Sequence, residues 1–163
     1  LYMIIHVRID ERLIHGQVAT MWTNNLKASR IMVVDDSAAK DNMVKMSLKL
    51  ATPDGVKLSI LSAKKAAANI LNGKYEGQRV FLIAKRPETL VKLIELGVEL
   101  TQINVGNMSH SEGKEKITNT ISVTKEDIEA FKKLEGMGIK LTAQLVPSYS
   151  PENFMELLKK NTK

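Results

Sequence analysis

Short apolar runs of strand length alternate with amphipathic stretches along the whole chain, and this alternation limits the possible folds more than any other feature. The runs are mostly consecutive Val, Ile and Leu residues, a composition typical of strands buried on both faces of a parallel sheet. We expect such strands at residues 3–9, 30–35, 56–61, 79–84, 102–105, 117–123 and 139–146.

Between these runs, apolar residues recur three and four positions apart, as on the buried face of a helix. Thr124 and Asp127 form a capping-box pattern, and Ser150 followed by Pro151 is expected to begin the last helix. Strands and helices joined by short connections favour right-handed crossovers, so we predict an α/β fold with an open, mostly parallel twisted sheet of about seven strands and helices on both faces. The other helices are expected at residues 17–26, 38–51, 63–71 and 88–96, and at 124–136, ended by the glycines that follow.

One pair of strands is expected to depart from the parallel pattern. Only the loop 106–113 separates strands 102–105 and 117–123, which is too short for a crossover helix, so this pair is expected to be antiparallel. We find no repeat or linker and therefore expect one domain over residues 3–163. Leu1 and Tyr2, which precede Met3, are expected to be a cloning remnant.

Composition narrows the class of protein. The 163-residue chain has no cysteine, which excludes a disulfide scaffold and a catalytic thiol and suits a reducing compartment. We see no apolar run of the roughly 18 residues that span a bilayer and no signal-peptide core, so we expect a cytoplasmic protein. The formal charge of +6 favours an anionic ligand or an acidic partner surface, whereas an aromatic content of 4% gives little support to base stacking and nucleic-acid binding.

The chemistry is concentrated in residues 8–18 (RIDERLIHGQV), directly after the first strand. In such sheets ligands bind beyond the carboxyl ends of the strands, near the point where the strand order reverses. Imidazole is the side chain best suited to be a neutral nucleophile near pH 7, which makes His15 the candidate nucleophile. Asp10 is a candidate for orienting the imidazole ring and stabilising its cationic form.

The same segment offers groups for a phosphate. Arg8 and Arg12 carry planar guanidinium groups that match phosphate oxygens. The first helix should begin close to His15 and Gly16, so free backbone N–H groups there could hold an anion, and Gly16 and Gln17 are candidates for binding phosphate. The plainer alternative is that these are surface ion pairs and an ordinary residue at the start of a helix.

The other two histidines are weaker candidates. His6 lies inside the first strand, where a packed or edge histidine is the simpler interpretation. His110 lies in the loop 106–113, which could close over the same site or could be a plain hairpin connection. The three histidines have no metal-ligand spacing, so we expect no metal site and no cofactor.

Asp35 and Asp36, at the end of the second strand, raise the alternative of a receiver-like domain in which Lys85 would be the receiver lysine. The third strand, however, is followed by Ser62 and supplies no phospho-accepting aspartate. The acidic pair is therefore expected to cap the next segment or to pair with arginines. Neither a P-loop nor a GxGxxG motif is present, so no nucleotide-binding motif supports a nucleotide ligand.

These motifs resemble the IIB components of the mannose/fructose/sorbose class of the bacterial phosphotransferase system (PTS). The resemblance covers essentially the whole chain. It rests on RIDERLIHGQV followed by Trp22, on VVDD at residues 33–36, on INVGNM at residues 103–108 and on the Val-Pro pair at residues 146–147.

The resemblance implies an open α/β sheet and phosphorylation of His15, at Nδ1 in that family, by a phosphohistidine of the IIA component. The acceptor would be a sugar carried by the membrane components IIC and IID, which implies a protein-N(pi)-phosphohistidine–sugar phosphotransferase that associates peripherally with the membrane transporter. Arg8, Asp10 and Arg12 match the positions that surround the phosphorylated ring.

The GNM sequence at residues 106–108 resembles the N-acetylgalactosamine-type members, with mannose, fructose and sorbose as alternative sugars. His110 lies one place later than the family pattern leads us to expect, which leaves its role open. A basic anion- or nucleic-acid-binding α/β module remains the alternative function, and a homo-oligomer is left open.

Overall fold

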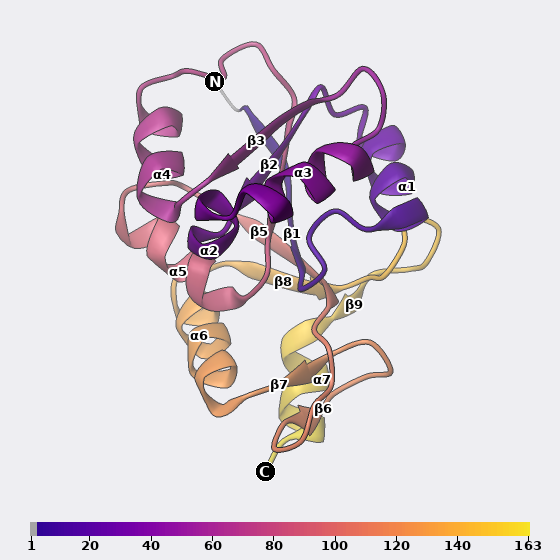
Figure 1. Cartoon of the computed structure of the whole chain (residues 1–163). Helices are drawn as coiled ribbons and strands as arrows, with labels where there is room; N and C mark the ends of the chain where they lie inside the picture. The colour runs from indigo at the N-terminus through magenta and orange to yellow at the C-terminus, as the bar shows by residue number, and fades with distance from the viewer. Residues whose placement is uncertain (1–2) are drawn as a thin grey trace.

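The computed structural model describes residues 3–163, and a seven-stranded sheet with the order β3-β2-β4-β1-β5-β8-β9 forms its centre (Figure 1). All neighbours in this sheet are parallel except β8 and β9, which are antiparallel. The predicted open, mostly parallel α/β sheet is confirmed; the expected remnant, Leu1 and Tyr2, lies outside the described residues. The strands of the sheet are β1 (Ile4–Asp10), β2 (Arg30–Val34), β3 (Lys57–Leu61), β4 (Val80–Ala84), β5 (Gln102–Asn107), β8 (Lys140–Ala143) and β9 (Glu152–Asn153).

Helices cover both faces of the sheet because alternate residues of the central strands point to opposite sides. In β2, Ile31 and Val33 pack with one group of helices and Met32 and Val34 with the other, and all four are fully buried. The first group comprises α1 (Gly16–Leu26), α2 (Asp36–Lys40) and α3 (Asn42–Ala51), and the second α4 (Ala63–Leu71), α5 (Pro87–Glu95), α6 (Lys125–Gly136) and α7 (Phe154–Asn161).

The helix expected at residues 38–51 is two helices. Asp41 has an extended backbone between α2 and α3, and its side chain accepts hydrogen bonds from the N–H groups of Met43 and Val44. An aspartate that caps the following turn in this way competes with helix continuation, which explains the break.

The strand expected at residues 117–123 does not join the sheet, and its antiparallel pairing with strand 102–105 is wrong. β6 (Glu115–Lys116) and β7 (Ser122–Val123) form a separate antiparallel pair, while β5 pairs in parallel with β1 and β8. The polar sequence Thr-Asn-Thr interrupts this apolar run. The backbone N–H groups of Ile117 and Thr118 both donate hydrogen bonds to the backbone oxygen of Ile121. The run therefore forms a turn of its own instead of a strand.

The start of the last helix was also predicted wrongly. Asn153, rather than Ser150, caps α7 and accepts a hydrogen bond from the N–H of Glu156 at 3.1 Å. Residues 152–153 first pair with β8, and this pairing delays the helix until Phe154. The capping box of Thr124 and Asp127 is confirmed at α6.

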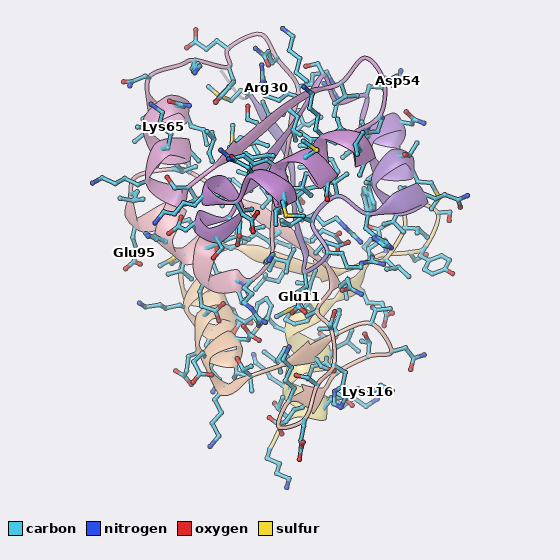
Figure 2. The ribbon with its side chains drawn as sticks, viewed as in Figure 1. Glu11, Arg30, Asp54, Lys65, Glu95 and Lys116 are labelled. Carbon is cyan, nitrogen blue, oxygen red and sulfur yellow. The ribbon has the colours of Figure 1, made fainter. Side chains whose placement is uncertain are left out.

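Charged side chains, among them Asp54, Lys65, Glu95 and Lys116, lie around the outline of the molecule in the view of Figure 2. Among residues 3–163, no helix is both long enough and apolar enough to cross a membrane.

Candidate functional site

β1 carries a polar row on the face that is turned toward α1. His6, Arg8 and Asp10 alternate with Val7 and Ile9, which pack into the core on the other side. Arg8 and Asp10 are each only 2% exposed. Two buried charged side chains on one strand require partners, because an unpaired buried charge is costly.

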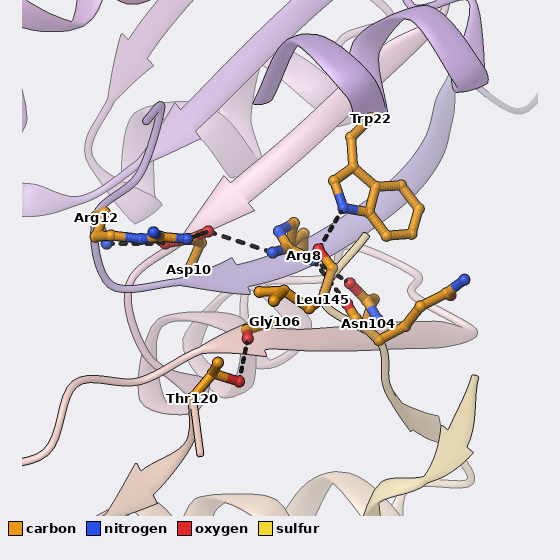
Figure 3. Close-up of polar contacts among 9 residues, drawn as sticks. Arg8, Asp10, Arg12, Trp22, Asn104, Gly106, Thr120 and Leu145 are labelled. Atoms are coloured by element: carbon orange, nitrogen blue, oxygen red, sulfur yellow. Dashed lines mark hydrogen bonds and ion pairs between the residues drawn. The ribbon is translucent and has the colours of Figure 1, made fainter. Parts of the chain in front are cut away.

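The hydrogen-bond partners of Arg8 lie on β1 itself, on β5 and directly after β8 (Figure 3). Its NH1 donates to Asn104 Oδ1 at 2.7 Å and to the backbone oxygen of Gln144 at 2.9 Å, and its NH2 donates to Asp10 Oδ2 at 3.3 Å. A Cβ at Gly106 would collide with this guanidinium, so glycine leaves the room that Arg8 occupies. These contacts use the guanidinium of Arg8 inside the protein and favour a positioning role for it.

Trp22 links this network to α1. The Arg8 guanidinium lies 5.3 Å from the centre of the Trp22 ring, in cation–π geometry, and the ring also stacks on His6 at 4.7 Å. The indole N–H donates to the backbone oxygen of Leu145 at 2.9 Å. α1 is therefore tied both to β1 and to the segment that follows β8 (Figure 3).

Asp10 binds Arg12 with both carboxylate oxygens. Asp10 Oδ1 accepts from the backbone N–H and the Nε of Arg12 at 3.0 and 3.1 Å, and Oδ2 accepts from NH2 at 3.1 Å. The Arg12 side chain remains 31% exposed. A bidentate pair of this kind holds the planar guanidinium in one orientation beyond the carboxyl end of β1, while part of the side chain faces solvent.

The loop between β1 and α1 is anchored by two apolar side chains. Leu13 and Ile14 are 3% and 4% exposed and belong to the core beneath α1. Leu13 has a left-handed backbone with φ of 62°, which is uncommon outside glycine and must be held by its surroundings. Burial of this pair brings the next residue, His15, to the surface.

His15 lies at the N-cap of α1, so the prediction that the first helix begins at His15 and Gly16 is confirmed. The imidazole makes no side-chain cap, and the first turn, which contains Gly16 and Gln17, has no acidic residue. The first backbone N–H groups of a helix lack partners within the helix, and the positive end of the helix dipole adds to them. This end of α1 is thus suited to an anion.

The structure does not bring Asp10 to His15. Within residues 3–163, the His15 imidazole forms no hydrogen bond or ion pair, and the Asp10 oxygens are engaged by Arg8 and Arg12. The predicted site residues therefore fall into two parts, a buried ion-pair network at the end of β1 and an exposed histidine at the start of α1.

Glu11 pairs with residues outside this network and joins the loop to parts of the chain that are distant in sequence. Its carboxylate lies 3.2 Å from Arg86 and 3.6 Å from Lys114, and Arg86 also pairs with Asp127 at 3.3 Å. Figure 2 places Glu11 near the middle of the view. Sequence reasoning missed Arg86 and Lys114 because nothing local to either residue indicates this partner.

The competing candidates have other partners. His110 Nδ1 lies 2.9 Å from Ser122 Oγ in the hairpin region. Asp35 caps α2, as expected of the acidic pair. Asp36 instead accepts from the N–H of Ala63 at the start of α4 and pairs with Lys92. In the part of the chain that the structure describes, no group of three or more His, Asp or Glu side chains could hold a metal ion.

Two half-buried titratable groups, His6 and Glu88, predict opposite slopes of stability against pH. Burial, together with the charge of Arg8, lowers the pKa of His6 from 6.5 to about 4. As the pH falls below 6.5, the unfolded chain therefore takes up a proton before the folded chain does. The free energy of unfolding decreases between pH 6.5 and pH 4, by at most ~3 kcal/mol. Burial, together with Asp127, raises the pKa of Glu88 from 4.5 to about 7, so its contribution is present below pH 4.5 and is lost as pH rises to 7.

The free energy of unfolding is measured between pH 4 and pH 7 by urea unfolding, with Trp22 fluorescence as the signal. We expect the decrease in stability between pH 6.5 and pH 4 that His6 causes to disappear in His6→Gln. The Glu88 slope should vanish in Glu88→Gln. An unchanged pH slope in either variant would contradict the assignment of that slope.

Comparison with known proteins shows which family this chain resembles. Residues 4–163 match the family model described as "PTS system sorbose subfamily IIB component". The chain is 42% identical over 160 residues to the mannose-specific EIIAB component of Escherichia coli (strain K12), covering 98% of the chain and 50% of that relative. It thus spans about half the length of these mannose-specific relatives.

Two further proteins match over nearly their full length. The fructose-specific EIIB component of Bacillus subtilis (strain 168) is 39% identical over 160 residues, which cover 98% of each chain. The solved IIBSor domain of the sorbose permease from Klebsiella pneumoniae superposes with a TM-score of 0.94 at 32% identity, covering 99% of each chain.

Proposed function

Because this chain belongs to the sorbose-subfamily IIB components of the phosphotransferase system, we propose that it is a phosphoryl carrier in sugar uptake and that His15 carries the phosphoryl group. The single observation that supports His15 most strongly is its place at the start of α1. There an exposed imidazole adjoins a helix N-terminus without a side-chain cap, three residues from an arginine held by a buried carboxylate.

The transfer requires positioning and charge stabilisation more than covalent chemistry. A nitrogen of His15 attacks the phosphorus of a phosphohistidine on the donor, Nδ1 being the nitrogen that the family uses. The new N–P bond forms as the donor's N–P bond breaks, the donor imidazole takes up a proton, and His15 releases one to solvent. In the second step a sugar hydroxyl attacks the same phosphorus, and the new O–P bond forms as the N–P bond of His15 breaks. The hydroxyl loses its proton and the imidazole of His15 takes one up, which returns it to its neutral form.

The surrounding groups then have distinct roles. Arg12 and the backbone N–H groups of Gly16 and Gln17 bind the phosphoryl oxygens, whose charge grows in the transition state. Asp10 acts through Arg12 by fixing its guanidinium, and we assign it this positioning role in place of direct orientation of the imidazole. Arg8 in turn donates a hydrogen bond to Asp10 Oδ2 and so helps to fix the carboxylate.

The partners follow from the family. The donor is the IIA component, and the sugar is presented by the membrane components IIC and IID, so residues 3–163 act as one domain at the cytoplasmic side of the membrane. The sugar stays a proposal: the similar proteins reported above are named for mannose, fructose and sorbose, whereas GNM at residues 106–108 favours N-acetylgalactosamine.

Peptide mass spectrometry tests this function directly. The chain is incubated with phosphoenolpyruvate, the general phosphotransferase proteins and a cognate IIA component, and the phosphate is then located. We expect one acid-labile, alkali-stable phosphate on the peptide that contains His15. Phosphate that is labile to both acid and alkali would indicate an acyl phosphate on an aspartate, and no phosphate from a demonstrably phosphorylated IIA would overturn the carrier function.

A further inference from the structure

α3 carries more apolar side chains than its packing uses. Val44 and Leu48 face the core beneath the helix, as expected for an amphipathic helix. Met43, Met46 and Leu50 form a second stripe, at positions i, i+3 and i+7, and are 82%, 66% and 83% exposed. Contiguous exposed apolar side chains of this kind mark interaction surfaces in soluble proteins.

Met43, at one end of the stripe, adjoins the loop that carries His15. A hollow of about 330 Å³ beside α3 is lined by Met43 and Ser47 together with Arg12 and Leu13. A second hollow, of about 470 Å³, lies between Ala51 at the end of α3 and the first turns of α1, including Gly16 and Met21. α1 and α3 pack on the same face of the sheet (Figure 1). We therefore expect a protein that covers the start of α1 to reach α3 as well.

Basic side chains flank the same surface. Lys45 and Lys49 follow one side of the stripe on α3, while Arg12 and Lys85 line the hollow on its other side. A partner that fits this surface has an apolar centre and an acidic or anionic rim, since opposite charges across an interface speed association and fix its register.

We propose that Met43, Met46 and Leu50 form the docking surface for the phosphorylated IIA donor domain, an inference that rests on the proposed function of His15. The donor arrives with a phosphoryl dianion and meets the unphosphorylated, basic form of this face, whereas the sugar is neutral and is met after the charge has been transferred. Methionine also suits this task, because its flexible, polarisable side chain adapts to the partner's shape.

A lipid surface is disfavoured by the same geometry. A bilayer on the stripe would also cover the His15 loop, because the two adjoin through the hollow beside Arg12, and it would exclude the donor domain from the imidazole. A docked protein, by contrast, needs His15 and the stripe in one interface.

The test compares Met46→Glu and Leu50→Glu with Leu71→Glu, a control on α4 whose side chain is also exposed, at 58%. Phosphoryl transfer from the phosphorylated IIA domain is measured against IIA concentration. We expect KM to rise about tenfold or more in the two α3 variants, with kcat at saturating IIA and the far-ultraviolet circular dichroism unchanged, and the control to behave like the wild type.

Two results would overturn the inference. Unchanged KM with slower transfer to the sugar in membranes that contain IIC and IID would assign the stripe to the acceptor. Unchanged KM with lost binding to phosphatidylcholine–phosphatidylserine vesicles would assign it to lipid. If the wild type itself takes up no phosphate on His15, the proposed function fails separately, and titration with unphosphorylated IIA still decides whether the α3 variants weaken binding.

Discussion

Replacing His15 with alanine is expected to abolish phosphoryl uptake while the fold and its stability remain those of the wild type. The imidazole is exposed and makes no side-chain cap at α1, so its removal takes away no buried contact and should change the free energy of unfolding by no more than ~0.5 kcal/mol. Loss of the nucleophile removes the covalent step itself, and no positioning group can replace it. Incorporation of phosphate from a phosphorylated IIA component, measured by intact mass, provides the readout.

His110→Ala is the matched control for this variant. His110 is also exposed and lies in a loop that follows a strand, but its Nδ1 contacts Ser122 instead of a helix terminus. We expect His110→Ala to take up phosphate at the wild-type rate. Full uptake in His15→Ala, or loss of uptake in His110→Ala alone, would contradict His15 as the nucleophile and assign this role to the loop 106–113.

The fold could be predicted wherever the local pattern was unambiguous. The uninterrupted apolar residues of β2 and β4 predicted strands buried on both faces, and α4 was predicted with its observed bounds. Prediction failed where two local signals compete. Ser150-Pro151 and Asn153 both suit the start of a helix, and only the pairing of residues 152–153 with β8, a tertiary contact, selects the second.

The candidate site, too, has a part that the sequence could predict and a part that it could not. Arg8, Asp10, Arg12 and His15 are close in the chain and at the end of a strand, so the sequence alone could nominate them. The partners of Arg8 could not be predicted, because Asn104 and Gln144 are 96 and 136 positions away and are brought near only by the order of the strands. Arg8 and Arg12 therefore looked equivalent in sequence, although Arg8 is buried and Arg12 is partly exposed.

That difference between the two arginines makes Arg12 the one whose removal should slow transfer without unfolding the chain. Asp10 keeps Arg8 as a partner when Arg12 is replaced, so no buried charge is left alone. We expect Arg12→Ala to lower kcat for transfer from phosphorylated IIA by about 10²–10³-fold, the range typical of losing one charge-stabilising donor. Arg12→Lys should recover only part of the rate, because an ammonium group cannot form the two-point pair with Asp10.

A double-mutant cycle shows whether Asp10 acts through Arg12. Asp10→Asn weakens the hold on the guanidinium and should reduce kcat by itself, but it should add little in the Arg12→Ala background, since the group it positions is already gone. Rapid-quench measurement of phosphoryl transfer at saturating IIA separates this effect from docking, which depends on the α3 stripe. Additive losses would mean that Asp10 reaches the imidazole on its own, and an unchanged kcat in Arg12→Ala would remove this arginine from the site.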